Sequence, residues 1–329
     1  MRVLVTGASG MLGGALARAL TERGDEVTVL QRRPAGLGLP EVLADVADAG
    51  AVRAAVAGQQ AVIHLAAKVN VTGDWADYQR ANVTGTWTVA EACRTSDVER
   101  LVHVSSPSVA HAGHSLVGVG AGPADPRRAR GPYARSKAAA EQIALGADGS
   151  QLQVVALRPH VVWGPGDMQL VARIVARART GRLPVLGSGA ALMDTTYVSN
   201  AVDALVAALD RVPAIHGESL VVSNGEPRPI AEVLGDIAQA AGAPRPTRHV
   251  PARAARAAGA VAQTLWPLRG LVRRDAGDQD PPITRFVAEQ LSTAHWFDQR
   301  RTREALAWTP RVSLDEGLDE LARWYRQGG

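Results

Sequence analysis

The chain has 329 residues, 46% of them hydrophobic, which is enough to bury a large core and to build a main domain with a smaller one beside it. Its formal net charge of +4 is modest, and its arginines are scattered rather than gathered in one stripe with aromatic residues, so nucleic acid is not expected as a partner. A single cysteine, Cys93, excludes an intrachain disulfide and is typical of a reducing compartment, and the eight histidines show no paired spacing that would predict a metal site.

The chain begins with a predicted strand, Val3 to Val5, so we expect no targeting segment before it and a cytoplasmic protein. Three glycines at three-residue spacing follow, namely Gly7, Gly10 and Gly13. A predicted helix then runs from Leu12 to Arg23, and a second strand from Glu26 to Gln31. Glycines at such a turn let the backbone approach a pyrophosphate, whose charge the helix N-terminus attracts. An ordinary tight turn is the alternative, but the order of strand, turn, helix and strand favours a dinucleotide-binding unit.

The residues that end the second predicted strand bear on which dinucleotide would bind. An NAD-binding protein usually places a carboxylate there to hold both hydroxyls of the adenine ribose. This chain has Arg32 and Arg33 instead. Two guanidiniums can clamp a 2′-phosphate, which favours NADP over NAD as the cofactor. The alternative is a solvated pair of surface arginines.

Strands and helices alternate along the rest of the chain, which predicts an α/β fold with a doubly wound parallel sheet of Rossmann type. The further predicted strands are Ala61–Leu65, Leu101–Val104, Val154–Leu157 and Ser219–Val222. The further predicted helices are Val83–Arg94, Tyr133–Ala147, Leu170–Arg179 and Ile230–Ala241. The clearest loop of the first half is 113–131. We assign residues 1–165 and 192–223 to a nucleotide-binding domain, and residues 166–191 and 224–329 to a smaller, mostly C-terminal substrate-binding domain.

Tyr133 and Lys137 are four residues apart in a predicted helix, and Lys137 is one of only two lysines in the chain. The spacing puts an ammonium on the same helical face as a phenol, which we expect to draw the tyrosine pKa down from about 10. A tyrosine tuned in this way can donate a proton to a ketone oxygen as hydride arrives at carbon. The sequence therefore predicts a hydride-transfer site at this helix.

Two basic stretches border the predicted substrate domain. The loop before the tyrosine carries Arg127, Arg128 and Arg130, which we hypothesise receive an anionic part of the substrate; solvated charge is the alternative. Residues 252–274 mix arginines with apolar residues such as Leu265 and Trp266. They predict a lid over a hydrophobic substrate within a lid region 252–285, a weak contact with a membrane surface, or a plain packing helix. The arginines argue against a membrane-spanning helix.

Motifs spread over essentially the whole chain resemble those of the extended short-chain dehydrogenases/reductases. They are Thr6-Gly7-x-x-Gly10-x-x-Gly13, Asp45-Val46, His64-Leu65-Ala66-Ala67, Asn82-Val83-x-Gly85-Thr86, Val104-Ser105-Ser106-Pro107-Ser108-Val109, Tyr133-x-x-x-Lys137, Leu157-Arg158-Pro159-His160-Val161-Val162 and Asp194-Thr195-Thr196-Tyr197-Val198-x-Asn200. Within that superfamily the chain most resembles the 3β-hydroxysteroid dehydrogenase-like branch, with bacterial sterol dehydrogenases and 2-alkyl-3-oxoalkanoate reductases. The resemblance to this branch rests on Pro107-Ser108-Val109, Trp163-Gly164-Pro165-Gly166-Asp167, Ile283-Thr284-Arg285-Phe286 and His295-Trp296-Phe297-Asp298.

The resemblance implies a catalytic set and a cofactor-binding set. Ser106, rather than Ser105 or Ser108, matches the catalytic hydroxyl that acts with Tyr133 and Lys137. The residues implied for cofactor binding are Gly7, Ser9, Gly10, Met11, Leu12, Gly13, Arg32, Arg33, Asp45, Val46, Ala66, Ala67, Lys68, Asn82, Tyr133, Lys137, Pro159 and Val162. Of these, Asp45 and Val46 would receive the adenine, Ala66 and Ala67 the sugar and pyrophosphate edge, and Pro159 and Val162 the nicotinamide carboxamide. Asn82 would order the backbone near the site.

These expectations predict an NAD(P)-dependent oxidoreductase that interconverts a secondary alcohol and a ketone on a hydrophobic substrate, of the 3β-hydroxysteroid or long-chain 3-oxo acid type. A homodimer is the expected assembly. One alternative is a nucleotide-sugar epimerase or reductase, which shares the fold and the Ser-Tyr-Lys set, although the branch-specific residues and the apolar stretch argue against it. Another alternative is a non-catalytic redox sensor that holds NADP; such proteins tend to lose the Tyr-x-x-x-Lys motif, which this chain has.

Overall fold

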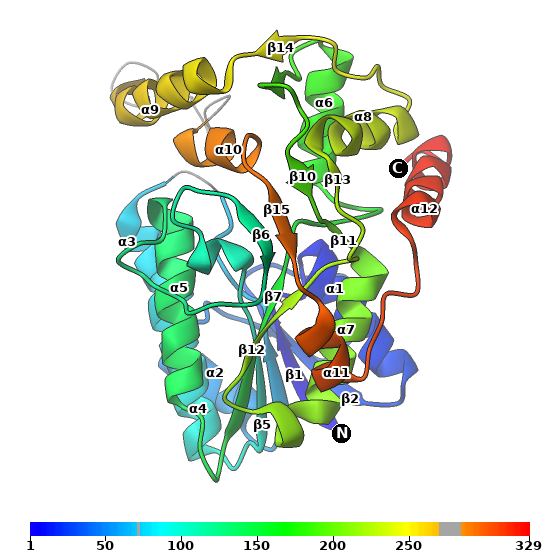
Figure 1. Cartoon of the computed structure of the whole chain (residues 1–329). Coiled ribbons are helices and arrows are strands. Elements are labelled where there is room, and N and C mark those ends of the chain that lie inside the picture. The colour runs from blue at the N-terminus through cyan, green and yellow to red at the C-terminus, as the bar shows by residue number, and fades with distance from the viewer. Residues whose placement is uncertain (71–72, 270–283) are drawn as a thin grey trace.

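The fold is that of a computed structural model, which describes residues 1–70, 73–269 and 284–329 and the side chains of all of these except 263–269. Within these residues, seven parallel strands form the main sheet, in the order β12-β7-β5-β4-β1-β2-β3 (Figure 1). In that order the strands are β12 (Ser219–Val222), β7 (Gln153–Pro159), β5 (Arg100–Val104), β4 (Ala61–His64), β1 (Arg2–Thr6), β2 (Glu26–Gln31) and β3 (Glu41–Leu43). The chain runs outward from β1 to β3 and then crosses back to β4. Ligands of such sheets bind at the carboxyl ends of the strands beside this reversal.

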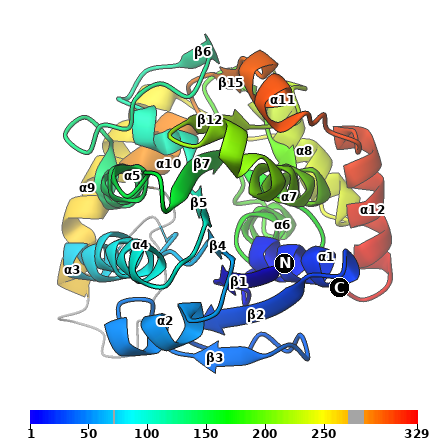
Figure 2. The same cartoon turned by 90° about the horizontal axis from the view of Figure 1, so that it is seen from below.

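Helices cover both faces of the main sheet, as the view in Figure 2 shows. The helices of one face are α1 (Met11–Glu22), α7 (Val198–Ile215) and α11 (Arg300–Leu306). Those of the other face are α2 (Ala49–Val56), α4 (Gly85–Thr95) and α5 (Gly131–Gly146). Because apolar side chains are buried on both faces, the central strands are nearly continuous apolar runs in the sequence. The predicted α/β class with a doubly wound parallel sheet is confirmed.

A smaller part of the molecule lies above the carboxyl ends of the main strands in Figure 1. Its strands form a four-stranded sheet in the order β13 (Arg228–Pro229), β10 (Leu192–Met193), β15 (His295–Phe297) and β6 (Leu116–Val119). Two short parallel pairs join β11 (Thr196–Tyr197) to β8 (Val162–Trp163), and β14 (His249–Val250) to β9 (Val185–Leu186). The helices that share its apolar core are α6 (Leu170–Arg179), α8 (Ile230–Ala240) and α12 (Leu314–Arg326). Its sheet takes β6 and β10 from residues that the sequence assigned to the nucleotide-binding domain.

Four helical segments lie around the upper rim of the main sheet. They are α3 (Trp75–Tyr78), the 3₁₀ turn η2 (Pro107–Ala110), α9 (Ala252–Arg269) and α10 (Arg285–Gln290). The π-helix η1 (Gln79–Thr84) joins α3 to α4 and carries the buried Asn82. The predicted stretch 252–274 is helical as far as Arg269. The side chains of Leu265 and Trp266, and the rest of the stretch up to 283, lie outside the described residues.

No helix of the described residues is long and apolar enough to cross a membrane.

Candidate active site

The glycine-rich turn between β1 and α1 is packed too tightly for side chains. A Cβ atom on Gly13 would lie 2.4 Å from the carbonyl oxygen of Gly7, and a Cβ on Gly7 would lie 2.9 Å from Cα of Ala66. Gly7 also has φ of +82°, which glycine adopts at little cost. Gly10 is the N-cap of α1, and in the described structure no side chain caps this helix and no acid stands in its first turn. The free N–H groups at this end fit the pyrophosphate of a dinucleotide.

A buried chain of hydrogen bonds holds the end of β4 against this turn. The backbone N–H of Ala66 donates to Oγ1 of Thr6 over 3.1 Å, and that oxygen lies 2.8 Å from Nδ1 of His64. Nε2 of His64 lies 3.0 Å from Oγ1 of Thr86. Burial lowers the pKa of His64 to about 3, with a smaller lowering by Lys137, so the ring is neutral at pH 7. This chain of hydrogen bonds places Ala66 beside Gly7.

The two arginines expected to choose the cofactor, Arg32 and Arg33, are exposed directly after β2. Neither forms an ion pair with any acid in the described part of the chain. The nearby carboxylate of Glu41 is engaged instead by the amide of Gln31 and, over 2.7 Å, by the backbone N–H of Ala35. Both guanidiniums are therefore available to an added phosphate, and the residues present fit NADP.

The two residues expected to receive the adenine lie after β3, where their surroundings differ. Asp45 accepts the backbone N–H of Ala47 over 2.9 Å and pairs with Nε of Arg80 over 3.2 Å. Val46 is buried against Gly85, since a Cβ there would lie 2.6 Å from Cγ2 of Val46. Arg80 on η1 is a neighbour that the sequence patterns did not indicate, because it is 35 residues away along the chain.

Asn82 joins three segments around the predicted cofactor cleft. Its Oδ1 accepts the backbone N–H of Lys68 over 2.6 Å, and its Nδ2 donates to the carbonyl of Lys68 over 3.1 Å. Nδ2 also donates to Oγ of Ser136 on α5 over 2.8 Å. The amide therefore orders the backbone after β4 and ties it to the helix that carries Tyr133.

The structure brings the three predicted catalytic residues together at the carboxyl end of β5. Ser106 caps η2, with its Oγ 2.9 Å from Oγ of Ser108, and its hydroxyl is near enough to the phenol of Tyr133 on α5 to lower the pKa of that phenol. Lys137 is buried one helical turn further on, and its Nζ donates to the carbonyl of Val104 over 2.6 Å. The buried Oγ of the neighbouring Ser105 has no partner among the described residues. This geometry favours Ser106 over Ser105 as the hydroxyl that acts with Tyr133.

The electrostatics of Tyr133 differ from the sequence expectation. Burial raises the pKa of its phenol, and the smaller effect of the Ser106 hydrogen bond lowers it, so the net direction is upward. Burial therefore outweighs the lowering that the sequence predicted, and the ammonium of Lys137 donates its described hydrogen bond to the carbonyl of Val104 at the end of β5. Burial lowers the pKa of Lys137 itself to about 8, against an opposing effect of Glu141. Lys137 is therefore mostly charged at pH 7.

The segment expected to meet the nicotinamide carboxamide contains a strained residue. Pro159 ends β7, Val162 begins β8, and Val161 between them has φ of +45°. Positive φ is rare for a β-branched residue and costs on the order of 1–3 kcal/mol. Such strain gathers at functional sites, and no pattern in the sequence indicates it.

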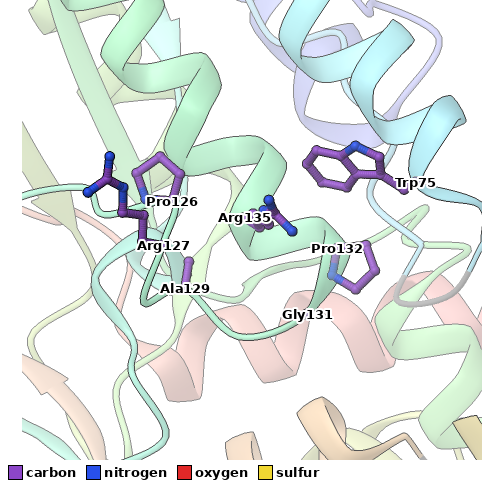
Figure 3. Close-up of a pocket in the computed structure, with 7 residues that line it drawn as sticks. All are labelled: Trp75, Pro126, Arg127, Ala129, Gly131, Pro132 and Arg135. Carbon is purple, nitrogen blue, oxygen red and sulfur yellow. The ribbon is translucent and has the colours of Figure 1, made fainter.

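Helix α10 contributes an aromatic neighbour to Tyr133. The ring of Phe286 on α10 is 6.5 Å from that of Tyr133. Beside them is a cavity of about 570 Å³, lined by residues of α3, of the loop before α5 and of α5 itself (Figure 3). Its lining residues are Trp75, Pro126, Arg127, Ala129, Gly131, Pro132 and Arg135. In the described residues, no group of three His, Cys, Asp or Glu side chains could hold a metal ion.

Comparison with known proteins agrees with this geometry. The chain is 42% identical, over 98% of its own length and 98% of the relative's, to "2-alkyl-3-oxoalkanoate reductase" of Stenotrophomonas maltophilia. It is 28% identical to "3-beta-hydroxysteroid dehydrogenase" of Mycolicibacterium neoaurum, over 98% of the chain and 91% of that protein. A solved structure, "MoeE5 in complex with UDP-glucose and NAD", is 28% identical, with a TM-score of 0.77 over 99% of both chains. Residues 3–223 match the model of the NAD dependent epimerase/dehydratase family. The chain belongs to this family, within its extended short-chain dehydrogenases/reductases.

Proposed function

We propose that the protein reduces the ketone of a long-chain 3-oxo acid or a related hydrophobic substrate to a secondary alcohol, with NADPH as the hydride donor. The observation that carries the proposal is the contact between Ser106 and Tyr133 beside the buried Lys137, at the same sheet edge as the glycine-rich turn. The relative named as an oxoalkanoate reductase is 42% identical and the one named as a hydroxysteroid dehydrogenase is 28% identical, which supports a 3-oxo acid over a sterol as the substrate. The reverse oxidation would use the same residues.

The chain's own residues supply the proton and hold the reacting oxygen. NADPH, when bound, supplies the hydride that adds to the carbonyl carbon. As that carbon accepts the hydride, the carbonyl oxygen takes the phenolic proton of Tyr133, and the hydroxyl of Ser106 donates a hydrogen bond to the same oxygen. The positive charge of Lys137, one helical turn away, favours the phenolate that remains until solvent returns a proton.

NADP is the proposed cofactor, and the exposed Arg32 and Arg33 at the end of β2, which have no ion pair among the described residues, support it. The family match and the neighbouring solved structures support an NAD-type dinucleotide.

The remaining proposals concern the state of the protein. We propose a cytoplasmic homodimer, and the exposed Trp87 on α4, 55% accessible, supports an interface at that helix. Weak contact of 252–274 with a membrane surface is proposed from its arginines and apolar residues. Light scattering tests the dimer, and sedimentation with anionic vesicles tests the membrane contact.

A substrate screen tests the proposed reaction. Purified protein with NADPH is offered long-chain 3-oxo acids, sterol ketones and nucleotide sugars, and products are separated by chromatography so that epimerisation is also detected. We expect turnover of the apolar ketones and a loss of roughly 10²–10⁴-fold in Tyr133→Phe, which should still bind NADPH. Turnover of a nucleotide sugar alone would overturn the proposed substrate class. A Tyr133→Phe enzyme with most of the wild-type rate would overturn the proposed acid.

A further inference from the structure

The cavity beside α5 combines positive charge with apolar walls. Its seven lining residues include two arginines and no acid. Figure 3 shows Arg135 of α5 between Arg127 and Pro126 on one side and Trp75 and Pro132 on the other. A volume of about 570 Å³ is within the usual range of small-molecule sites. The lining therefore fits an anionic group attached to an apolar or flexible chain.

Both guanidiniums of the cavity are available to a ligand. Arg135 and Arg127 are exposed, and within the described residues neither forms an ion pair. The guanidinium of Arg135 lies 4.8 Å from the ring centroid of Trp75, a cation–π contact that leaves the N–H groups at its edge free to donate. Asp125 accepts the backbone N–H groups of Arg127 and Arg128 over 2.8 Å and 3.3 Å, which orders the turn that carries Arg127.

The structure separates the three loop arginines that the sequence grouped together. Arg127 lines the cavity, whereas Nε of Arg130 donates to the carbonyl of Ala112 over 3.3 Å, and Arg128 is exposed outside the lining. The second arginine of the lining is Arg135, which the sequence patterns did not indicate. The first turn of α5 adds positive potential, since it contains no acid and, among the described residues, no side chain caps it.

The position of Arg135 on α5 determines which anion can bind there. Tyr133 and Arg135 are two residues apart, so their side chains leave the helix about 200° apart. An anion bound by Arg135 therefore lies at least one helix diameter, roughly 10–12 Å, from a ketone at Tyr133. We propose, on the basis of the proposed reductase function, that this cavity binds an anionic oxygen group, a phosphate or carboxylate, that the substrate carries many bonds away from its reacting ketone. The thioester of a phosphorylated pantetheine carrier and a long chain with a terminal carboxylate both meet this requirement.

Two pairs of substrates test the proposal and distinguish its two sources. One pair is the 3-oxohexadecanoyl thioester of 4′-phosphopantetheine and that of pantetheine; the other is a long-chain ketone with a terminal carboxylate and its methyl ester. The variant is Arg127→Gln with Arg135→Gln. Its matched control is Arg53→Gln with Arg128→Gln. This control also removes two positive charges, but at exposed positions outside the cavity.

We expect kcat/KM for the anionic member of one pair to fall roughly 10- to 100-fold in the variant, as for the loss of charge-assisted hydrogen bonds, and to stay within about twofold in the control. The neutral member should change little in either protein. A fall in the first pair identifies a phosphate, and a fall in the second identifies a carboxylate. Equal effects on anionic and neutral members of both pairs would overturn the proposal.

A binding measurement separates failure of this site from failure of the reductase function. If the wild-type protein reduces no ketone, calorimetric titration with 4′-phosphopantetheine and with dodecanoate, without cofactor, decides the matter. Binding to the wild type and the control that is lost in the variant supports the cavity as an anion site. Binding to none of the three proteins, or equally to all of them, overturns it.

Discussion

Two adjacent serines, Ser105 and Ser106, are chemically identical, so only their individual surroundings distinguish which of them acts with Tyr133. The hydroxyl of Ser106 is near enough to the phenol to lower its pKa, whereas the Oγ of Ser105 is buried without a partner among the described residues. We expect Ser106→Ala to lower kcat by about 10²-fold, the scale of one lost donor to a developing oxyanion. Ser105→Ala is the matched control and should keep most of the wild-type kcat. Steady-state kinetics on both variants checks this, and the reverse pattern would move the site by one residue.

Cofactor choice is also set by individual residues, Arg32 and Arg33 at the end of β2. Replacing both by glutamine should weaken NADPH binding roughly 10- to 100-fold, because charge-assisted hydrogen bonds to the 2′-phosphate are lost. NADH, which lacks that phosphate, is the internal control, and its affinity should change little. Dissociation constants from fluorescence titration give the answer. Similar affinities of the wild-type protein for both cofactors would contradict the assignment.

At the scale of elements, a buried ion pair ties α5, the helix that carries Tyr133, to the main sheet. Nε of Arg158 on β7 donates to Glu141 on α5 over 2.8 Å, and Oγ of Ser219 on β12 donates to the same carboxylate over 2.9 Å. Both charged side chains are only 1% exposed. Removing one partner leaves the other charge buried and unpaired, so Glu141→Leu should lower the free energy of unfolding by about 3–5 kcal/mol.

The double variant Glu141→Leu with Arg158→Met is the test that isolates this pair. It should recover much of the lost stability, because an apolar pair replaces two desolvated charges. Urea unfolding followed by circular dichroism measures the wild type, the single variants Glu141→Leu and Arg158→Met, and the double variant. If the loss of unfolding free energy in the double variant equalled the sum of the losses in the two single variants, the two side chains would not be coupled as the structure indicates.

The elements that the sequence predicted well are those with a strong local pattern. Strand β2 and helix α6 were predicted with the observed bounds, and β1, α1 and α5 within two residues. Strand β6 was not predicted. It lies in the predicted loop 113–131 and pairs with β15, which is far along the chain. Its four residues carry too little periodicity for a local reading. The catalytic positions followed from motifs, but the contact of Asp45 with Arg80 and the strain at Val161 depend on tertiary structure.

At the scale of the whole molecule, histidines pack where the small sheet meets the main sheet. The rings of His111 and His295 are 4.9 Å apart, and those of His160 and His295 are 5.9 Å apart. They come from the segment after η2, from the end of β7 and from β15, so they join the two parts of the fold. Both ring nitrogens of His111 are without a hydrogen-bond partner in the described structure. Protonating any of these rings would place a charge in a buried site.

The pH dependence of stability should follow from these buried histidines. Burial lowers the pKa of His64 to about 3, of His160 to about 4 and of His295 to about 2, and lowers those of His103 and His111 as well. Below about pH 6.5 the unfolded chain therefore binds more protons than the folded chain, and stability is lost as the pH falls from there toward 4. Burial raises the pKa of Asp194 to about 6, which acts in the opposite direction between about pH 4 and 6, but this is one group against five.

Urea unfolding between pH 7.5 and 4.5 measures the size of this effect. Each depressed histidine contributes a slope of up to about 1.4 kcal/mol per pH unit, so the free energy of unfolding should fall by several kcal/mol between pH 6.5 and 4.5. His111→Phe removes one titrating ring whose nitrogens have no described partner, and should flatten the slope without a matching loss of stability at pH 7.5. A free energy of unfolding that stays constant from pH 7.5 to 4.5 in the wild type would show that folding does not depress the pKa values of these imidazoles as their burial indicates.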